Sequence, residues 1–223
     1  MKLLLTDSGI RNASIRNALV DLLGKPIAEC TALCIPTAGY GGDADPVLPW
    51  RFVSGQAPGP MTALGWKSVG LLELTALPSL EEARWVSWVR EVDVLLANGG
   101  DTLYLAHWMR ESGLADLLPS LTETVYVGLS AGSMVMTPRV GQEFVGWKPP
   151  TGGDAGLGLV DFAMFPHLDY PDAPEHSMAA AQRWAAGIGS PAYAIDAQTA
   201  IKVVDGVVEV ISEGTWKLFN AAS

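Results

Sequence analysis

The segment best suited to a chemical reaction in this sequence is residues 128–132 (GLSAG), in which a serine lies between two glycines. The apolar run 124–127 (TVYV) before them predicts a buried strand, and the residues after them predict a helix. A strand, a G-x-S-x-G turn and a helix together form a nucleophile elbow. The glycines are expected where a Cβ would clash, and the Ala131 amide would face an oxyanion formed beside Ser130. A serine that merely caps the helix is the alternative interpretation.

A serine nucleophile needs a base, and the chain has only three histidines. His167 follows an apolar run in FAMFPHLDYP, at a predicted strand end, where α/β proteins gather their chemistry. His176 lies in the first turns of a predicted helix, and His107 lies within another helix, on its surface or in packing. We therefore predict His167 as the base, ahead of His176 and then His107.

The base in turn needs an orienting acid. Asp196 sits between apolar residues in AYAIDAQTAIKV, where an unpaired carboxylate would be costly, and it is the preferred candidate. Asp169 and Asp172 lie close to His167 in the sequence, but both are typical of surface carboxylates.

A second oxyanion donor is predicted in the segment 97–100 (ANGG), which ends another apolar run. Two consecutive glycines let the backbone approach a ligand closely, and the Gly100 amide is the candidate donor. The alternative is a turn that enters a helix without any ligand.

Alternating apolar runs and amphipathic stretches position these residues and predict one α/β domain over residues 1–223. Its sheet is expected to be mainly parallel, flanked by helices, with antiparallel strands near the C-terminus and a hairpin turn at Asp205-Gly206. The Gly- and Pro-rich segment 40–67 predicts a loop and a short helix at the rim of the site. Strands are predicted within 2–9, 29–39, 67–74, 93–100 and 124–128, and helices within 12–24, 79–92, 101–113 and 174–187.

The amino-acid composition disfavours several classes of binding partner. The net charge of -10 disfavours nucleic acid and anionic membrane surfaces as partners. Cys30 and Cys34 lie on one predicted strand and are interpreted as small core residues. The sequence has no Cys/His cluster suited to zinc, and no metal or cofactor is expected. The N-terminal apolar run is too short for a signal peptide or a membrane span, which predicts a cytoplasmic protein without disulfides. Trp85, Trp88 and Trp108 read as core or interface anchors and could support a homodimer.

Several of these segments, in this order, resemble the peptidase E family of serine peptidases, which includes aspartyl dipeptidases and has cyanophycinases as relatives. The matching segments are LLLTDSGI, CIPTAG, LLANGGDTLYL, VGLSAGSM, GLGLVDF, FPHLDYP and AIDAQTAIKV. The resemblance implies a flavodoxin-like sheet akin to class I glutamine amidotransferases, with serine replacing their cysteine. It also implies a metal-independent peptidase that acts on very short peptides. By position, Ser130 matches the nucleophile, His167 the base, and Gly100 and Ala131 the oxyanion amides.

The chain departs from the family pattern at two positions. The family's third triad member is typically a glutamate, and the matching residue here is Ala197, next to Asp196. Aspartyl dipeptidases carry an arginine after the catalytic histidine that reads the substrate's aspartate, and here only Arg183 is available, slightly out of register. A serine dipeptidase is therefore expected, with its preference for Asp-X substrates left open.

Three other functions are weighed against the dipeptidase. An α/β-hydrolase esterase would have its acid between serine and histidine, whereas Asp196 follows His167. A non-catalytic relative that binds a peptide or amino acid is an alternative, because of Ala197. A different amide hydrolase, such as a cyanophycinase-like enzyme, is the third.

Overall fold

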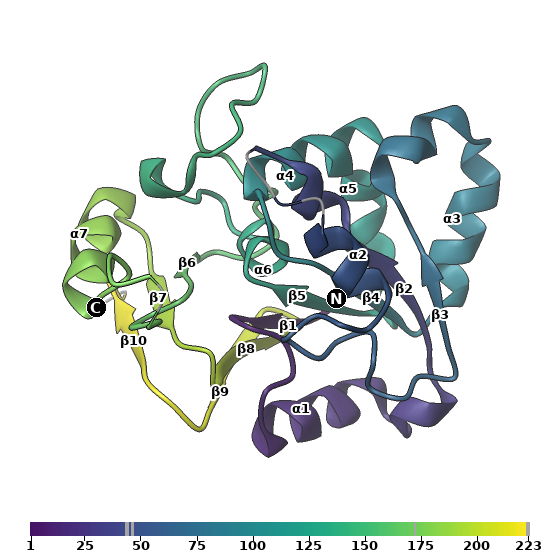
Figure 1. Cartoon of the computed structure of the whole chain (residues 1–223), viewed down its shortest axis with the longest axis horizontal. Helices are drawn as coiled ribbons and strands as arrows, with labels where there is room; N and C mark the ends of the chain where they lie inside the picture. The colour runs from purple at the N-terminus through teal and green to yellow at the C-terminus, as the bar shows by residue number, and fades with distance from the viewer. Residues whose placement is uncertain (43–44, 46, 172, 222–223) are drawn as a thin grey trace.

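A computed structural model describes residues 1–42, 45, 47–171 and 173–221, so Asp172 lies outside the described residues. Its central sheet has seven strands in the order β3-β2-β4-β5-β1-β8-β9 (Figure 1). Neighbouring strands from β3 to β1 are parallel, while β8 is antiparallel to both β1 and β9. The strands are β1 (Lys2–Thr6), β2 (Thr31–Ile35), β3 (Ser68–Leu71), β4 (Val94–Ala97), β5 (Val125–Leu129), β8 (Thr199–Val204) and β9 (Val207–Ser212). The predicted fold class, mainly parallel with antiparallel strands near the C-terminus, is confirmed.

The strands β1, β2 and β4 are buried on both faces, as in a parallel sheet covered by helices. Alternate residues of each strand enter two different apolar clusters: Leu3 and Leu5 face one, and Leu4 faces the other. The first cluster is covered by α3, α4 and α5, and the second by α1, on the opposite side of the sheet in Figure 1. The helices are α1 (Ala13–Leu23), α2 (Val47–Val53), α3 (Glu82–Glu91), α4 (Thr102–Glu111), α5 (Leu114–Leu117), α6 (Ala131–Met134) and α7 (Met178–Ile188).

A second, three-stranded sheet stands beside the central one, in the order β10-β7-β6. Its strands are β6 (Ala163–Phe165), β7 (Ala192–Ile195) and β10 (Trp216–Phe219), and α7 packs against it (Figure 1). The buried ring of Trp184 anchors α7, and its Nε1–H donates to the Val140 carbonyl at 2.8 Å. This sheet carries the segment that leads from β6 to His167.

Short-range signals fix the ends of the helices. Asn12 caps α1 by accepting the Ile15 amide at 2.9 Å, and Gly24 ends it at φ 68°, as the sequence indicated. Asp101 caps α4 in the same manner through the Tyr104 amide. This second cap matters for the site, because it starts a helix directly after Gly100.

The remaining short turns are 3-10 helices. They span Ile27–Glu29, Thr37–Tyr40, Leu74–Ser79, Leu118–Ser120 and Gln142–Phe144. In the described part of the chain, no helix has the length and apolar character needed to cross a membrane.

Candidate active site

The site forms where three adjacent strands of the central sheet end. Strands β4, β5 and β1 are neighbours and parallel, so the residues that follow them meet at one edge. Asn98 follows β4, Ser130 follows β5, and Asp7 follows β1. His167 approaches the same edge from the end of β6 in the second sheet.

The turn around Ser130 is as tight as the G-x-S-x-G pattern predicted. A Cβ on Gly128 would lie 2.5 Å from the Gly132 carbonyl oxygen, and one on Gly132 would lie 2.4 Å from the Ala97 oxygen. Both distances are far inside van der Waals contact, so each position requires glycine. Ser130 itself has φ 49° and ψ -109°, a sparsely populated conformation that costs of order 1–3 kcal/mol and is typical of functional turns.

Hydrogen bonds from β1 hold this strained turn in place. The Ser130 amide donates to the Thr6 carbonyl at 3.0 Å, and the Ser133 hydroxyl donates to the same oxygen at 2.8 Å. The Thr6 hydroxyl donates to the Gly128 carbonyl at 2.6 Å. Burial raises the pKa of Tyr126, whose hydroxyl donates to the Gly132 carbonyl at 2.7 Å. The end of β1 therefore clamps the elbow that β5 provides.

Ser130 and His167 are brought together as the sequence predicted. The Ser130 Oγ and His167 Nε2 atoms lie 2.8 Å apart, within hydrogen-bond distance. This is the contact that a general base needs in order to take the serine proton. His167 has φ 60°, in the left-handed region that disfavours residues with a Cβ, so its backbone must be held by its surroundings.

Asp7 holds His167 in that position, and sequence reasoning missed it. The Asp7 carboxylate is fully buried, and its Oδ1 lies 3.3 Å from His167 Nδ1. The same oxygen accepts the His167 backbone amide, and Oδ2 accepts the Ser8 hydroxyl at 2.6 Å. One carboxylate therefore fixes both the ring and the strained backbone of His167. A signal was available, since Asp7 directly follows a buried strand in LLLTDSG.

Asp196, the acid expected from the sequence, is engaged elsewhere. Its Oδ1 accepts the Thr199 hydroxyl at 2.7 Å and the Gln198 amide at 3.0 Å, and its Oδ2 accepts the Thr215 amide. These bonds join the turn between β7 and β8 to the segment before β10. Asp169 is exposed, so in the described structure the carboxylate beside His167 is that of Asp7.

Two backbone amides are available near Ser130. Among the described residues, the amides of Gly100 and Ala131 donate no hydrogen bond to another protein group. Gly100 has φ 138°, and a Cβ there would lie 2.2 Å from the Ala38 carbonyl oxygen. Glycine is therefore required at this position, and Gly100 lines the pocket beside Ser130.

The remaining candidates lie in different places. Arg183 is exposed on the outer face of α7, away from the buried face formed by Ala181, Trp184 and Ala185. His107 on α4 packs edge-on against Trp108 and at a tilt against Trp147.

His176 lies closer to the site than the sequence suggested. Its ring is parallel to that of His167, with ring centroids 6.0 Å apart and planes at 17°. Burial, and then the neighbouring His167, lower the pKa of His176. A neutral His176 ring beside the candidate base is therefore the expected form at neutral pH.

Two hollows meet at Ser130. The first, which we call the arginine pocket, has a volume of about 260 Å³ and is lined by Arg11, Arg51 and several apolar side chains. The second, the acidic pocket, has a volume of about 340 Å³ and is lined by Asp101, Glu143 and His176, among others. Ser130, His167 and Gly100 line both. The predicted rim segment 40–67 contributes Leu48, Arg51, Ala57, Pro58 and Gly59 to the arginine pocket.

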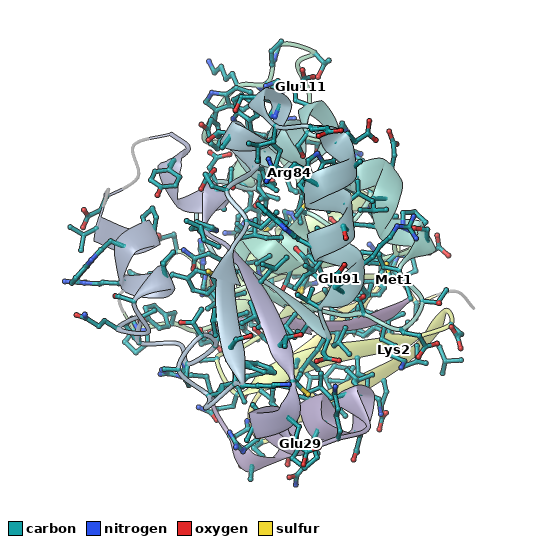
Figure 2. The ribbon with its side chains drawn as sticks, turned by 90° about the vertical axis from the view of Figure 1, so that its right-hand side faces the viewer. Met1, Lys2, Glu29, Arg84, Glu91 and Glu111 are labelled. Carbon is teal, nitrogen blue, oxygen red and sulfur yellow. The ribbon has the colours of Figure 1, made fainter. Side chains whose placement is uncertain are left out.

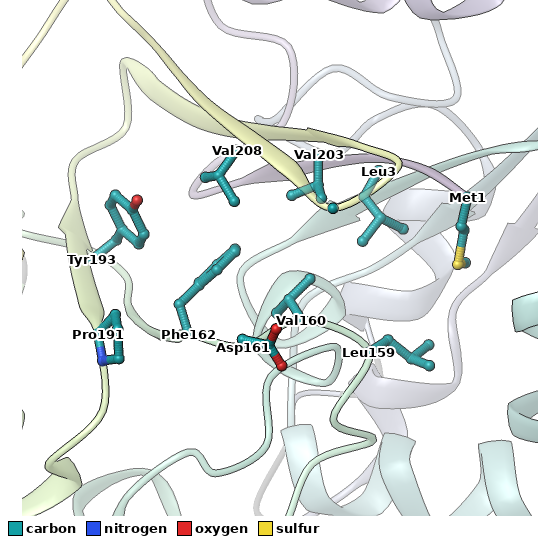
Figure 3. Close-up of a pocket in the computed structure, with 11 residues that line it drawn as sticks. Met1, Leu3, Leu159, Val160, Asp161, Phe162, Pro191, Tyr193, Val203 and Val208 are labelled. Atoms are coloured by element: carbon teal, nitrogen blue, oxygen red, sulfur yellow. The ribbon is translucent and has the colours of Figure 1, made fainter. Parts of the chain in front are cut away.

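A third hollow lies elsewhere in the molecule. It has a volume of about 300 Å³, and its lining of mostly apolar residues includes Leu3, Phe162, Tyr193 and Val208 (Figure 3). The lining does not include Ser130 or His167, so this hollow is separate from the candidate site.

Comparison with known proteins identifies a family and structures of similar fold. The family model described as Peptidase family S51 matches residues 3–211. A putative peptidase E protein from Listeria monocytogenes EGD-e has a similar structure, with 18% identity, a TM-score of 0.66, and coverage of 96% of this chain and 98% of that one. A peptidase from an acI-B1 actinobacterium is similar with 18% identity, a TM-score of 0.64, and coverage of 100% and 95% respectively. The comparison with curated sequences gives no match.

These two structures support the fold, and the family model covers nearly the whole chain. The resemblance inferred from the motifs is therefore confirmed: the chain belongs to peptidase family S51.

Proposed function

We propose that this peptidase is a serine dipeptidase in which Ser130 is the nucleophile, His167 the base and Asp7 the orienting acid. The observation that carries the proposal is the 2.8 Å contact between Ser130 Oγ and His167 Nε2. Asp7 takes the role that the sequence suggested for Asp196, because it is the carboxylate that lies beside His167. The amides of Gly100 and Ala131 are the proposed oxyanion donors.

The mechanism follows from these positions. Ser130 Oγ attacks the peptide carbonyl carbon while His167 Nε2 takes the hydroxyl proton. The oxyanion that forms accepts hydrogen bonds from the two amides, and the negative Asp7 stabilises the imidazolium of His167. The C–N bond then breaks as His167 gives its proton to the leaving amine. Water attacks the acyl ester, again with His167 as base, and Ser130 is released.

The chain order of these groups is acid, serine, histidine. It differs from the order serine, acid, histidine of the α/β-hydrolase esterases, although both use a G-x-S-x-G elbow. The two small pockets on either side of Ser130 suit a short substrate. The enzyme's preference for aspartyl dipeptides is measured with a panel of dipeptides.

The test is hydrolysis of a panel of Asp-X, Glu-X and neutral dipeptides by wild type, Ser130→Ala and Ser87→Ala. Ser87 is an exposed serine on α3, so its variant controls for the loss of a hydroxyl. We expect Ser130→Ala to lower kcat by about 10⁶-fold, the loss typical of a removed serine nucleophile, with Ser87→Ala unchanged.

Other outcomes would point to the alternatives. If wild type binds dipeptides but cleaves none, the chain is a binding protein and not an enzyme of this kind. If it cleaves only aspartyl amides or polymer ends, it is an amide hydrolase with a different substrate.

A further inference from the structure

The two pockets that meet at Ser130 carry opposite charges. Arg11 and Arg51 line the arginine pocket, whereas Asp101 and Glu143 line the acidic pocket. The chain as a whole has a net charge of -10, so two arginines in one small pocket run against the general charge of the molecule. A ligand that spans Ser130 therefore meets positive charge at one end and negative charge at the other.

Arg11 is held in place to face this pocket. Its Nη1 donates to the Pro58 carbonyl at 2.7 Å, which ties the side chain to the loop that forms the pocket wall. A guanidinium has five N–H donors in a fixed plane, so this bond leaves others for a ligand. Among the described residues, neither Arg11 nor Arg51 has a carboxylate within ion-pair distance.

The acidic pocket is built differently. The Asp101 carboxylate accepts the amides of Tyr104 and Trp147. Glu143 is exposed at the mouth of the same pocket. An ammonium group is the ligand that such a wall attracts.

A dipeptide has an ammonium at one end and a carboxylate at the other, with its scissile bond between them. Building on the proposed dipeptidase function, we infer that Arg11 and Arg51 form a subsite for the C-terminal carboxylate of the substrate, and that the amino end lies toward Asp101 and Glu143. Arginine suits this role because its planar N–H groups match a carboxylate through two parallel hydrogen bonds. The leaving amino acid would then occupy the arginine pocket, with its side chain against apolar residues such as Leu129 and Tyr170.

The same chemistry could come from an acidic side chain of the substrate instead of its C-terminus. The opposite charge of the second pocket favours the C-terminus, because an ammonium and a carboxylate then lie on the two sides of the scissile bond. Two substrate pairs separate the sources. Asp-Leu against Asp-Leu amide removes the terminal carboxylate, and Asp-Leu against Asn-Leu removes the side-chain carboxylate.

We would measure kcat and KM for these substrates with wild type, Arg11→Ala, Arg51→Ala, Arg51→Lys and Arg84→Ala. Arg84 is an exposed arginine on α3 and serves as the matched control (Figure 2). For wild type we expect the terminal amide to have a kcat/KM about 10- to 100-fold lower than the free acid, mainly through KM. In Arg11→Ala and Arg51→Ala, most of the preference in kcat/KM for the free acid over the amide should be lost. Arg51→Lys should retain part of this preference, and Arg84→Ala should retain all of it.

Binding gives a second readout that does not need turnover. Calorimetric titration of Ser130→Ala with Asp-Leu and Asp-Leu amide should show the same preference, and it should vanish when Arg51→Ala is added. The inference is overturned if wild type cleaves and binds both peptides equally. It is also overturned if the arginine variants change only the Asp-Leu to Asn-Leu ratio, which would assign the subsite to an acidic side chain. If no dipeptide is cleaved but Ser130→Ala still prefers the free acid, the proposed function fails and the subsite stands.

Discussion

The proposed catalytic groups and the charged groups around them differ in how firmly the fold holds them. Asp7 is fully buried, and Ser130 is fixed by backbone hydrogen bonds from β1 and by glycines that tolerate no Cβ. Arg11, Arg51 and Glu143 are exposed side chains on loops and short helices. In the proposed mechanism the chemistry therefore depends on the packed sheet edge, whereas the inferred substrate contacts lie on a surface that can vary without disturbing the sheet.

Among variants that keep the serine, the largest effect is predicted for Asp7→Asn, which tests the buried groups in this comparison. An asparagine keeps the shape of the side chain, but it cannot stabilise the imidazolium and favours the wrong tautomer of His167. We expect kcat to fall by about 10⁴-fold with little change in KM, as in other triads that lose their acid. Stopped-flow or steady-state assays with the dipeptide that wild type cleaves fastest would measure kcat and KM.

Circular dichroism of Asp7→Asn is the necessary control. The variant should keep the native spectrum, since the side chain has nearly the same volume. A kcat within tenfold of wild type in a folded Asp7→Asn variant would remove Asp7 from the mechanism.

An intermediate effect is predicted for Asp196→Ala, which should change the stability of the protein and leave its activity nearly unchanged. The variant loses hydrogen bonds to Gln198, Thr199 and Thr215, each worth roughly 0.5–1.5 kcal/mol. We expect the free energy of unfolding to fall by about 1–3 kcal/mol while kcat stays within a few fold of wild type. Urea denaturation and dipeptide assays on one preparation would compare the two. A loss of kcat as large as that of Asp7→Asn would restore Asp196 as the triad acid.

The smallest effect concerns pH and His176. Its pKa is lowered in the folded state by burial and by His167, so the unfolded chain binds the proton more readily. The contribution of His176 to the free energy of unfolding is fully present above the ordinary histidine pKa of about 6.5. This contribution is lost as the pH falls from there through the lowered pKa of the folded state. His176→Gln should therefore have a shallower decline in Tm than wild type between about pH 6.5 and 5. Identical slopes in the two proteins would show that His176 does not contribute.

Local patterns in the sequence identified much of this site. The elbow glycines and the pairing of a strand-end serine with His167 depend on residues close in sequence or on strand ends, which periodicity reveals. Asp7 precedes the serine in the chain, whereas the acids predicted from the sequence all follow the histidine. Its role depends on β1 lying between β5 and β8, a pairing that no local pattern encodes.

The same reason explains why the arginines were missed. Arg11 and Arg51 lie in segments with no distinctive pattern, and only the tertiary arrangement brings them to one pocket beside Ser130. Arg183 was favoured instead because it follows the histidine in sequence, but its position on the outer face of α7 turns it to solvent. Proximity in sequence is a poor guide to a pocket whose walls come from distant loops.

The place of β1 also has a consequence for the nascent chain. Thr6 bonds to a carbonyl 122 positions later, and Asp7 bonds to the His167 amide 160 positions later. During synthesis β1 must wait for β5, and then for β8, before it is paired on both sides. A chain synthesised only as far as β5 therefore has Thr6 and Ser130 but lacks His167. In the proposed mechanism, hydrolysis therefore begins only after His167 has been synthesised and has docked against Asp7.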